Sequence, residues 1–96
     1  MKKGIKLEHY FSGDKNWQDF VEIVKPNFKA NEKYKEELLS SLDYQLDIAI
    51  VVYFRFGDDS LAWIHRKVPA LDKTPVDCLR SPELIKRLKE ALLRMP

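Results

Sequence analysis

The stretch that decides the fold is FGDDSLAWIHRKVPALDKTPVDCLRSPELIKRLKEALLRMP, residues 56–96. Within it a hydroxyl residue twice stands directly before a proline, at Thr74-Pro75 and at Ser81-Pro82. A Thr or Ser side chain caps the first turn of a helix, and proline fits the first helical position because no partner awaits its missing N–H there. The stretch therefore predicts short helices in close succession, with the last one beginning at Pro82.

The apolar residues before this stretch predict a long helix from near Glu32 to Phe56, with Gly57 at the position where glycine commonly ends a helix. The segment from Ile48 to Phe54 is apolar on nearly every side, so it also suits a buried β-strand, and periodicity alone leaves both alternatives open. Continuity with the preceding pattern and the position of Gly57 favour the helix. The apolar stripe consists of Leu38, Leu42, Leu46, Ala49, Tyr53 and Phe56.

These patterns predict an all-α, single-domain bundle with a central buried helix and a C-terminal amphipathic helix. A first helix should begin at Lys15 and end before Pro26, because the residue preceding a proline is pushed out of the helical region. Within one compact unit, residues 1–45 form a helical region that could be a reduced DNA-binding module, and residues 46–96 form a second region. The apolar positions are Trp17, Phe20, Val21 and Val24 in the first helix, and Leu84, Ile85, Leu88, Leu92 and Met95 in the last.

Composition is typical of a globular domain, with 45% hydrophobic and 33% charged residues. The formal net charge of +2 argues against wholesale, non-specific binding to phosphate groups. Cys78 is the only cysteine, so no internal disulfide can form, which suits a reducing cytoplasm. No apolar segment follows the charged N-terminus as in a signal peptide, and the longest apolar run is too short for a membrane span. We therefore expect a cytoplasmic protein without a membrane partner.

The residues that could carry chemistry do not form a recognisable site. Cys78 would need a base within hydrogen-bond reach to act as a nucleophile, and nothing in the sequence places His65 there. The two histidines lack the spacing of a zinc site, so we expect no catalytic residue, metal or cofactor. Asp58-Asp59 is better explained as the cap of a short helix from Ser60 to about Arg66. Trp63 in that helix is expected in the core, because a small domain needs its large apolar surface.

Residues 46–96 resemble the antitoxin C-terminal domain of the MbcA/ParS/Xre group, whose members are paired with RES-domain toxins. Members show a buried helix ending in FG, a short helix with AxxW, a loop with the pattern PxLGGxTPxxLL, and a final helix. The sequence departs from this pattern at two loop positions, where Asp72 and Lys73 replace the paired glycines. The matching residues are Phe56-Gly57, Ala62-Trp63, Pro69-Ala70-Leu71, Thr74-Pro75, Leu79, and Ala91 to Met95.

The resemblance implies a non-enzymatic antitoxin or immunity-type protein that binds a RES-type, NAD-consuming toxin. In this family the C-terminal region lies against the toxin and obstructs its substrate pocket, so removal of residues 94–96 should abolish inhibition and leave the fold intact. Arginine suits such a role, because its planar guanidinium pairs with carboxylates in two-pronged fashion. We expect a few apolar anchors, Leu71, Met95 and in part Trp63, to dominate the binding energy. The expected toxin-binding residues are Leu71, Asp72, Lys73, Arg87, Arg94, Met95 and Pro96.

Two other functions stay open at this stage. A DNA-binding transcriptional regulator would need a helix-turn-helix within residues 14–56 and a homodimer that reads a two-fold operator. Five lysines within residues 14–56 supply charge for it, but acids are interspersed among them. An adaptor or chaperone for another protein partner is the second alternative.

Overall fold

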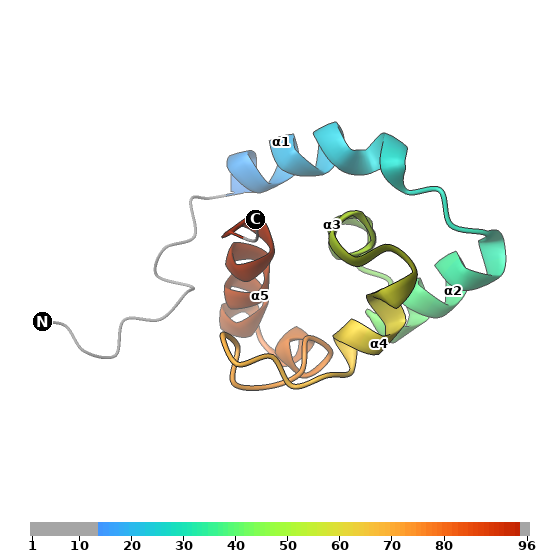
Figure 1. The fold of residues 1–96 in the computed structure, drawn as a ribbon. Helices are drawn as coiled ribbons and strands as arrows, with labels where there is room; N and C mark the ends of the chain where they lie inside the picture. The colour runs from blue at the N-terminus through green and yellow to red at the C-terminus, as the bar shows by residue number, and fades with distance from the viewer. Residues whose placement is uncertain (1–13, 95–96) are drawn as a thin grey trace, which may run out of the picture.

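The computed structural model describes residues 14–94, and Met95 and Pro96 therefore lie outside the described residues. Its longer helices are α1 (Asp14–Val24), α2 (Glu32–Ser41), α3 (Leu46–Phe56), α4 (Ser60–Ile64) and α5 (Pro82–Arg94). Three short 3₁₀ helices join them: η2 (Lys25–Asn27), η3 (Gly57–Asp59) and η4 (Asp77–Arg80). Residues 14–94 contain no β-strand, so the all-α fold predicted from the sequence is confirmed (Figure 1).

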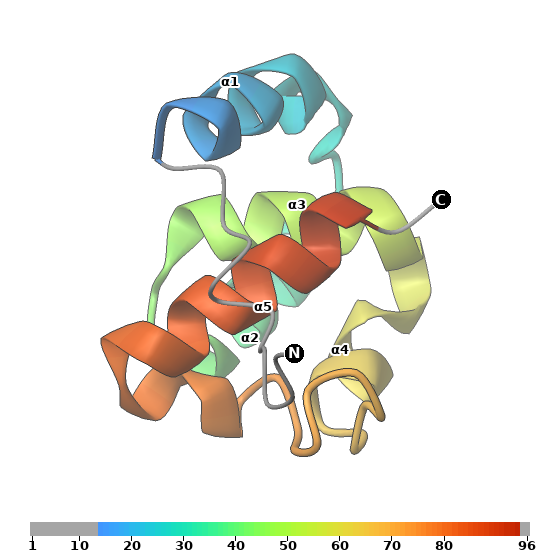
Figure 2. The ribbon, with the colours of Figure 1, turned by 90° about the vertical axis from the view of Figure 1, so that its left-hand side faces the viewer.

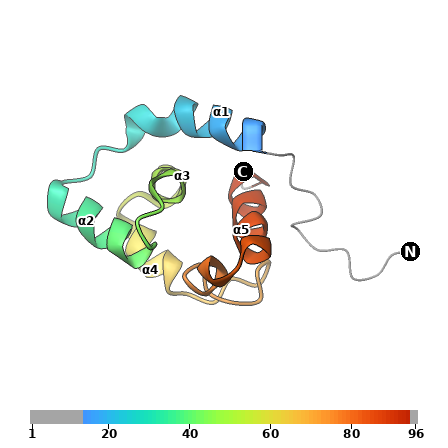
Figure 3. The same ribbon diagram turned by 180° about the vertical axis from the view of Figure 1, so that it is seen from behind.

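Helix α3 is the central element. The five consecutive residues from Ile48 to Val52 are all buried, so this helix is covered on every side over its middle turns. Helices α1 and α5 pack on it from one side, and α2 and α4 lie next to each other across from them (Figures 1 and 3). The helical alternative for residues 48–54 is therefore confirmed, and the strand alternative is wrong.

The single long helix expected from Glu32 to Phe56 is wrong, because the chain breaks after Ser41 and turns before Leu46. The N–H of Tyr44 donates to the carbonyl of Leu39 at 2.7 Å, and the N–H of Asp43 donates to that of Ser40 at 3.3 Å. This pair of bonds is the Schellman pattern that ends a helix, with Asp43 in the left-handed position that glycine usually occupies (φ 57°). The apolar residues keep their helical spacing across this break, so the sequence pattern gave no sign of the turn.

The turn after α3 follows the expected glycine, and Gly57 has a positive φ of 54°. The expected cap by Asp58 or Asp59 is wrong, since neither side chain caps α4 and η3 leads directly into it. The Ser60 hydroxyl instead donates to the carbonyl of Gly57 at 2.7 Å. Helix α4 is also shorter than expected, ending at Ile64.

The expected helix start at Ser81-Pro82 is confirmed, whereas the helix expected from Pro75 begins two residues later, as the 3₁₀ helix η4 at Asp77. The Thr74 Oγ1 accepts from the N–H of Asp77 at 3.1 Å, and the Ser81 Oγ accepts from the N–H of Leu84 at 3.2 Å. Helix α5 then buries Leu88 and Leu92 completely, as its apolar face requires.

Candidate protein-binding site

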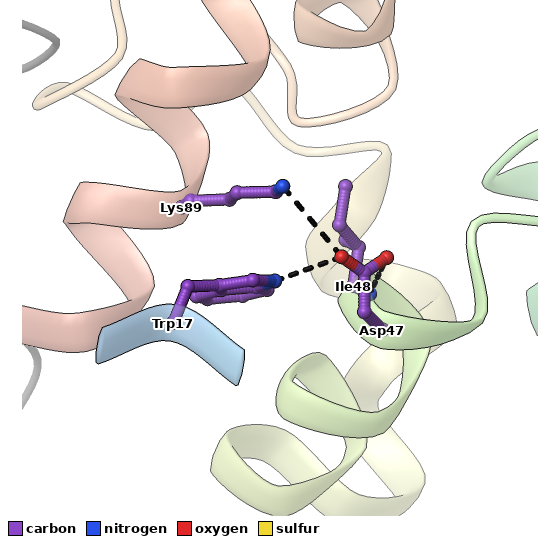
Figure 4. A network of polar contacts seen from close by, with 4 residues as sticks. All are labelled: Trp17, Asp47, Ile48 and Lys89. Carbon is purple, nitrogen blue, oxygen red and sulfur yellow. Dashed lines mark hydrogen bonds and ion pairs between the residues drawn. The ribbon is translucent and has the colours of Figure 1, made fainter. Parts of the chain in front are cut away.

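The C-terminal half of α5 is held against the rest of the protein by a polar cluster of three side chains (Figure 4). The indole Nε1–H of Trp17 in α1 donates to Oδ2 of Asp47 in α3 at 2.8 Å. The ammonium group of Lys89 in α5 lies 3.6 Å from the same carboxylate oxygen and 5.4 Å from the centre of the Trp17 ring. Because Trp17 is fully buried and the Lys89 side chain is only 16% exposed, this contact joins three helices away from bulk water.

A second contact holds the last turn of α5. The Arg55 Nε–H donates to the carbonyl of Leu92 at 3.1 Å, and its Nη2 lies at 3.5 Å from the carbonyl of Leu93. The last carbonyls of a helix have no partners within the helix, so a guanidinium caps them well. Partial burial lowers the pKa of Arg55 from its usual value. The end of α5, where the expected toxin-binding tail begins, is thus fixed relative to α3 (Figure 2).

The loop between α4 and η4 is held by a residue in the middle of α5. The Arg87 Nη1 donates to the carbonyl of Leu71 at 3.3 Å. The N–H of Val68 donates to the carbonyl of Lys73 at 3.1 Å, which closes the loop at its base. At its tip Asp72 adopts a left-handed conformation with φ 58° and lies 3.8 Å from Lys67 in an exposed ion pair.

Four of the seven expected toxin-binding residues therefore lie together, namely Leu71, Asp72, Lys73 and Arg87. Asp72 is exposed and Lys73 half-buried, but Leu71 is fully buried. The Leu71 side chain supports the loop from inside, so the surface anchor expected there is not present in the folded protein. Arg94 lies seven residues beyond Arg87, about 10 Å along the helix axis. The structure thus offers two separate surfaces, one beside the middle of α5 and one at its C-terminal end.

The conformation of Asp72 leads to a test of the loop. The Asp72→Val variant should lower the free energy of unfolding by about 1–3 kcal/mol, since a β-branched side chain is strained at positive φ. Asp72→Gly should leave it nearly unchanged, because glycine adopts this conformation freely and an exposed ion pair contributes little. Urea denaturation measures both. Equal stability of the two variants would show that the left-handed conformation is not required.

Trp63 and Cys78 both belong to the core, as expected. Trp63 is 7% exposed and stacks on Phe56 with ring centroids 4.3 Å apart, so it is not available as a surface anchor. Cys78 is fully buried, and this burial raises the pKa of its thiol. A raised pKa lowers the fraction of thiolate, which is the reactive form.

Exposed apolar side chains were missed by the sequence reasoning. Ile23 is 72% exposed and Phe54 42% exposed, and Tyr44 in the turn before α3 is exposed as well. Leu46, the first residue of α3, is also exposed, although it belongs to the expected apolar stripe. A signal existed for Ile23, because it falls outside the apolar stripe of its own helix. Phe54 likewise falls outside the stripe of α3.

The structure also bears on the DNA-binding alternative. In a helix-turn-helix the second helix must present an exposed face to the major groove. Helices α2 and α3 are joined by a short turn, but α3 buries the side chains from Ile48 to Val52. The burial of these middle turns does not support α3 as a recognition helix, and the DNA-binding alternative stays a prediction.

No family model matches the sequence, and comparisons with curated proteins and with solved structures likewise found no match. The antitoxin resemblance therefore depends only on the residues named for it. Among residues 14–94, no helix has the length and apolar composition needed to cross a membrane.

Proposed function

We propose that this chain is an antitoxin or immunity-type protein that acts in the cytoplasm. It binds a RES-type, NAD-consuming toxin and blocks the toxin's substrate pocket with its C-terminal region. The inhibition is steric, and the chain itself carries out no reaction.

The conformation of Asp72 is the observation that supports this proposal best. Asp72 stands where the antitoxin pattern has its first loop glycine, and its φ of 58° lies in the region that glycine prefers. The backbone at Asp72 therefore has the conformation that glycine favours, although this chain has aspartate at that position. Aspartate is among the few other residues that tolerate this region.

The loop is also ordered before any partner binds. Arg87 holds its Leu71 carbonyl, and the Val68–Lys73 hydrogen bond closes its base. Asp72 and Lys73 are thereby presented at the surface in one arrangement. A preorganised loop loses less conformational entropy on binding, which favours affinity.

The proposal is tested by co-expression with the RES-type protein of a neighbouring gene, followed by capture of the complex and measurement of cellular NAD. The wild type should form a stable complex and preserve the NAD pool. Asp72→Lys should weaken binding by about tenfold or more, because it reverses the charge within the contact. Asp43→Lys is the matched control, since Asp43 is an exposed aspartate with nearly the same φ in a distant turn.

Retention of NAD protection by Asp43→Lys and its loss in Asp72→Lys would support the loop as part of the toxin contact. If the wild type neither binds the RES-type protein nor preserves NAD, the antitoxin proposal is wrong. In that case the adaptor alternative becomes the better explanation.

A further inference from the structure

Three apolar side chains and one arginine lie together at the surface of α1 and α3, where Ile23 and Phe54 are exposed and Phe20 and Arg55 are half-buried. The rings of Phe20 and Phe54 meet edge to face with centroids 5.9 Å apart. The Arg55 guanidinium lies over both rings, 5.2 Å from the centre of Phe20 and 5.5 Å from that of Phe54. Ile23 follows Phe20 by three residues and so neighbours it on the surface of α1. We call Phe20, Ile23, Phe54 and Arg55 the α1–α3 ridge.

The exposure of this ridge is not explained by the fold. Single exposed apolar residues are normal, but groups of them that touch one another mark binding surfaces. Ile23 is 72% exposed and Phe54 42% exposed, although each lies in a helix whose buried residues form part of the core. The exposed parts of Ile23 and Phe54 therefore contribute little to the stability of the isolated domain.

The ridge is continuous with the end of α5. Arg55 belongs to the ridge and also holds the carbonyls of Leu92 and Leu93 in the last turn of that helix. Arg94 follows directly, with its side chain 55% exposed. A partner that receives the segment after α5 would consequently meet the ridge beside it.

The charge of Arg55 decides what can cover the ridge. In a two-fold symmetric dimer the same patch is present on both sides, so the small ridge would bring two Arg55 guanidinium groups close together. Like charges in such a contact oppose association. Asp19, the acidic neighbour of Ile23 on α1, is already paired with Lys15 at 3.2 Å. A second copy of this chain is therefore a poor occupant.

We infer that the α1–α3 ridge is a docking surface for a partner protein, and that the matching surface of the partner is apolar with a carboxylate side chain that meets Arg55. The identity of this partner as the RES-type toxin rests on the proposed function. The expected complementary surface, apolar with a carboxylate, does not depend on the proposed function. Aromatic residues and arginine are the types that most often dominate the binding energy of protein interfaces.

The first test uses anilinonaphthalene sulfonate, a fluorescent probe that combines an apolar ring system with an anion. Wild-type protein should bind the dye, with amide shifts in the NMR spectrum confined to the ends of α1 and α3. Ile23→Asp should weaken the binding by about tenfold, because it adds an exposed negative charge to the ridge. Leu46→Asp, an exposed leucine away from the ridge, is the matched control and should change the binding by less than about twofold. Phenylnaphthylamine, which lacks the anion, should bind more weakly than the sulfonate.

Equal weakening by Ile23→Asp and Leu46→Asp, or amide shifts outside the ridge, would overturn the inference. The same two variants are then tested for capture of the RES-type toxin. If wild type captures no toxin, the proposed function fails, and the inference is judged on the dye experiment alone. If wild type and Ile23→Asp capture it equally well, the partner docks elsewhere and the inference is wrong.

Discussion

Replacing Trp17 with alanine should lower the free energy of unfolding by about 3–5 kcal/mol, which is a large part of the stability of a domain this small. The indole is fully buried, and together with Val21 and Val24 it packs α1 against the core. Its loss leaves a cavity and removes one hydrogen-bond donor from Asp47. It also removes the ring beneath the Lys89 ammonium group. Urea denaturation followed by circular dichroism measures the change.

Trp17→Phe is the control that separates packing from hydrogen bonding. Phenylalanine retains an aromatic ring but has no N–H, so this variant should cost about 1–3 kcal/mol. A loss as large as that of the alanine variant would mean that the hydrogen bond to Asp47, rather than packing, attaches α1. A loss below about 1 kcal/mol for Trp17→Ala would contradict the prediction altogether.

The sequence predicted most of the helices because each depends on local chemistry. Pro26 limits α1, Gly57 supplies the positive φ after α3, and the hydroxyl of Ser81 caps α5. These signals act within a few residues of where they stand. A reading of the sequence could therefore place them without knowledge of the tertiary structure.

The break between α2 and α3 could not be predicted in the same way. Asp43 and Tyr44 both adopt positive φ there, and neither is the glycine that normally announces such a turn. Leu42 and Leu46 also keep the helical spacing across the break, so the periodicity gives no sign of it. Leu42 is fully buried at the break, so the apolar pattern there reports burial and not the turn.

Much of the candidate site depends on residues that are distant in sequence. Trp17, Asp47 and Lys89 come from three helices, and each alone has an ordinary explanation as a core residue, a first-turn acid or a surface lysine. The resemblance led to Arg87 and the loop, but it could not indicate that Leu71 faces inward. The pattern of residue types is the same whether a loop leucine supports the loop or contacts a partner.

Arg94→Ala should lower the free energy of unfolding by about 1–3 kcal/mol, although its own side chain is half exposed. Arg94 forms an ion pair with Glu90, four residues earlier in α5. The Glu90 side chain is only 5% exposed, and its Oε1 has no hydrogen-bond partner within the described part of the chain. Without Arg94 a buried carboxylate loses the charge that compensates its desolvation. The expectation that residues 94–96 can be removed without harm to the fold therefore needs correction.

The double variant Arg94→Ala/Glu90→Leu provides the control, because it removes the buried carboxylate together with its partner. It should recover most of the stability lost by Arg94→Ala, as replacing a buried ion pair with apolar residues is often neutral. Thermal and urea denaturation of the two variants and the wild type measure the recovery. Equal loss in the single and double variants would show that the burial of Glu90 is not the cause. Arg94 has two proposed roles, one in stabilising the fold through Glu90 and one in contacting the toxin. If the double variant is as stable as the wild type but does not inhibit the proposed toxin, the lost inhibition reflects the missing contact and not unfolding.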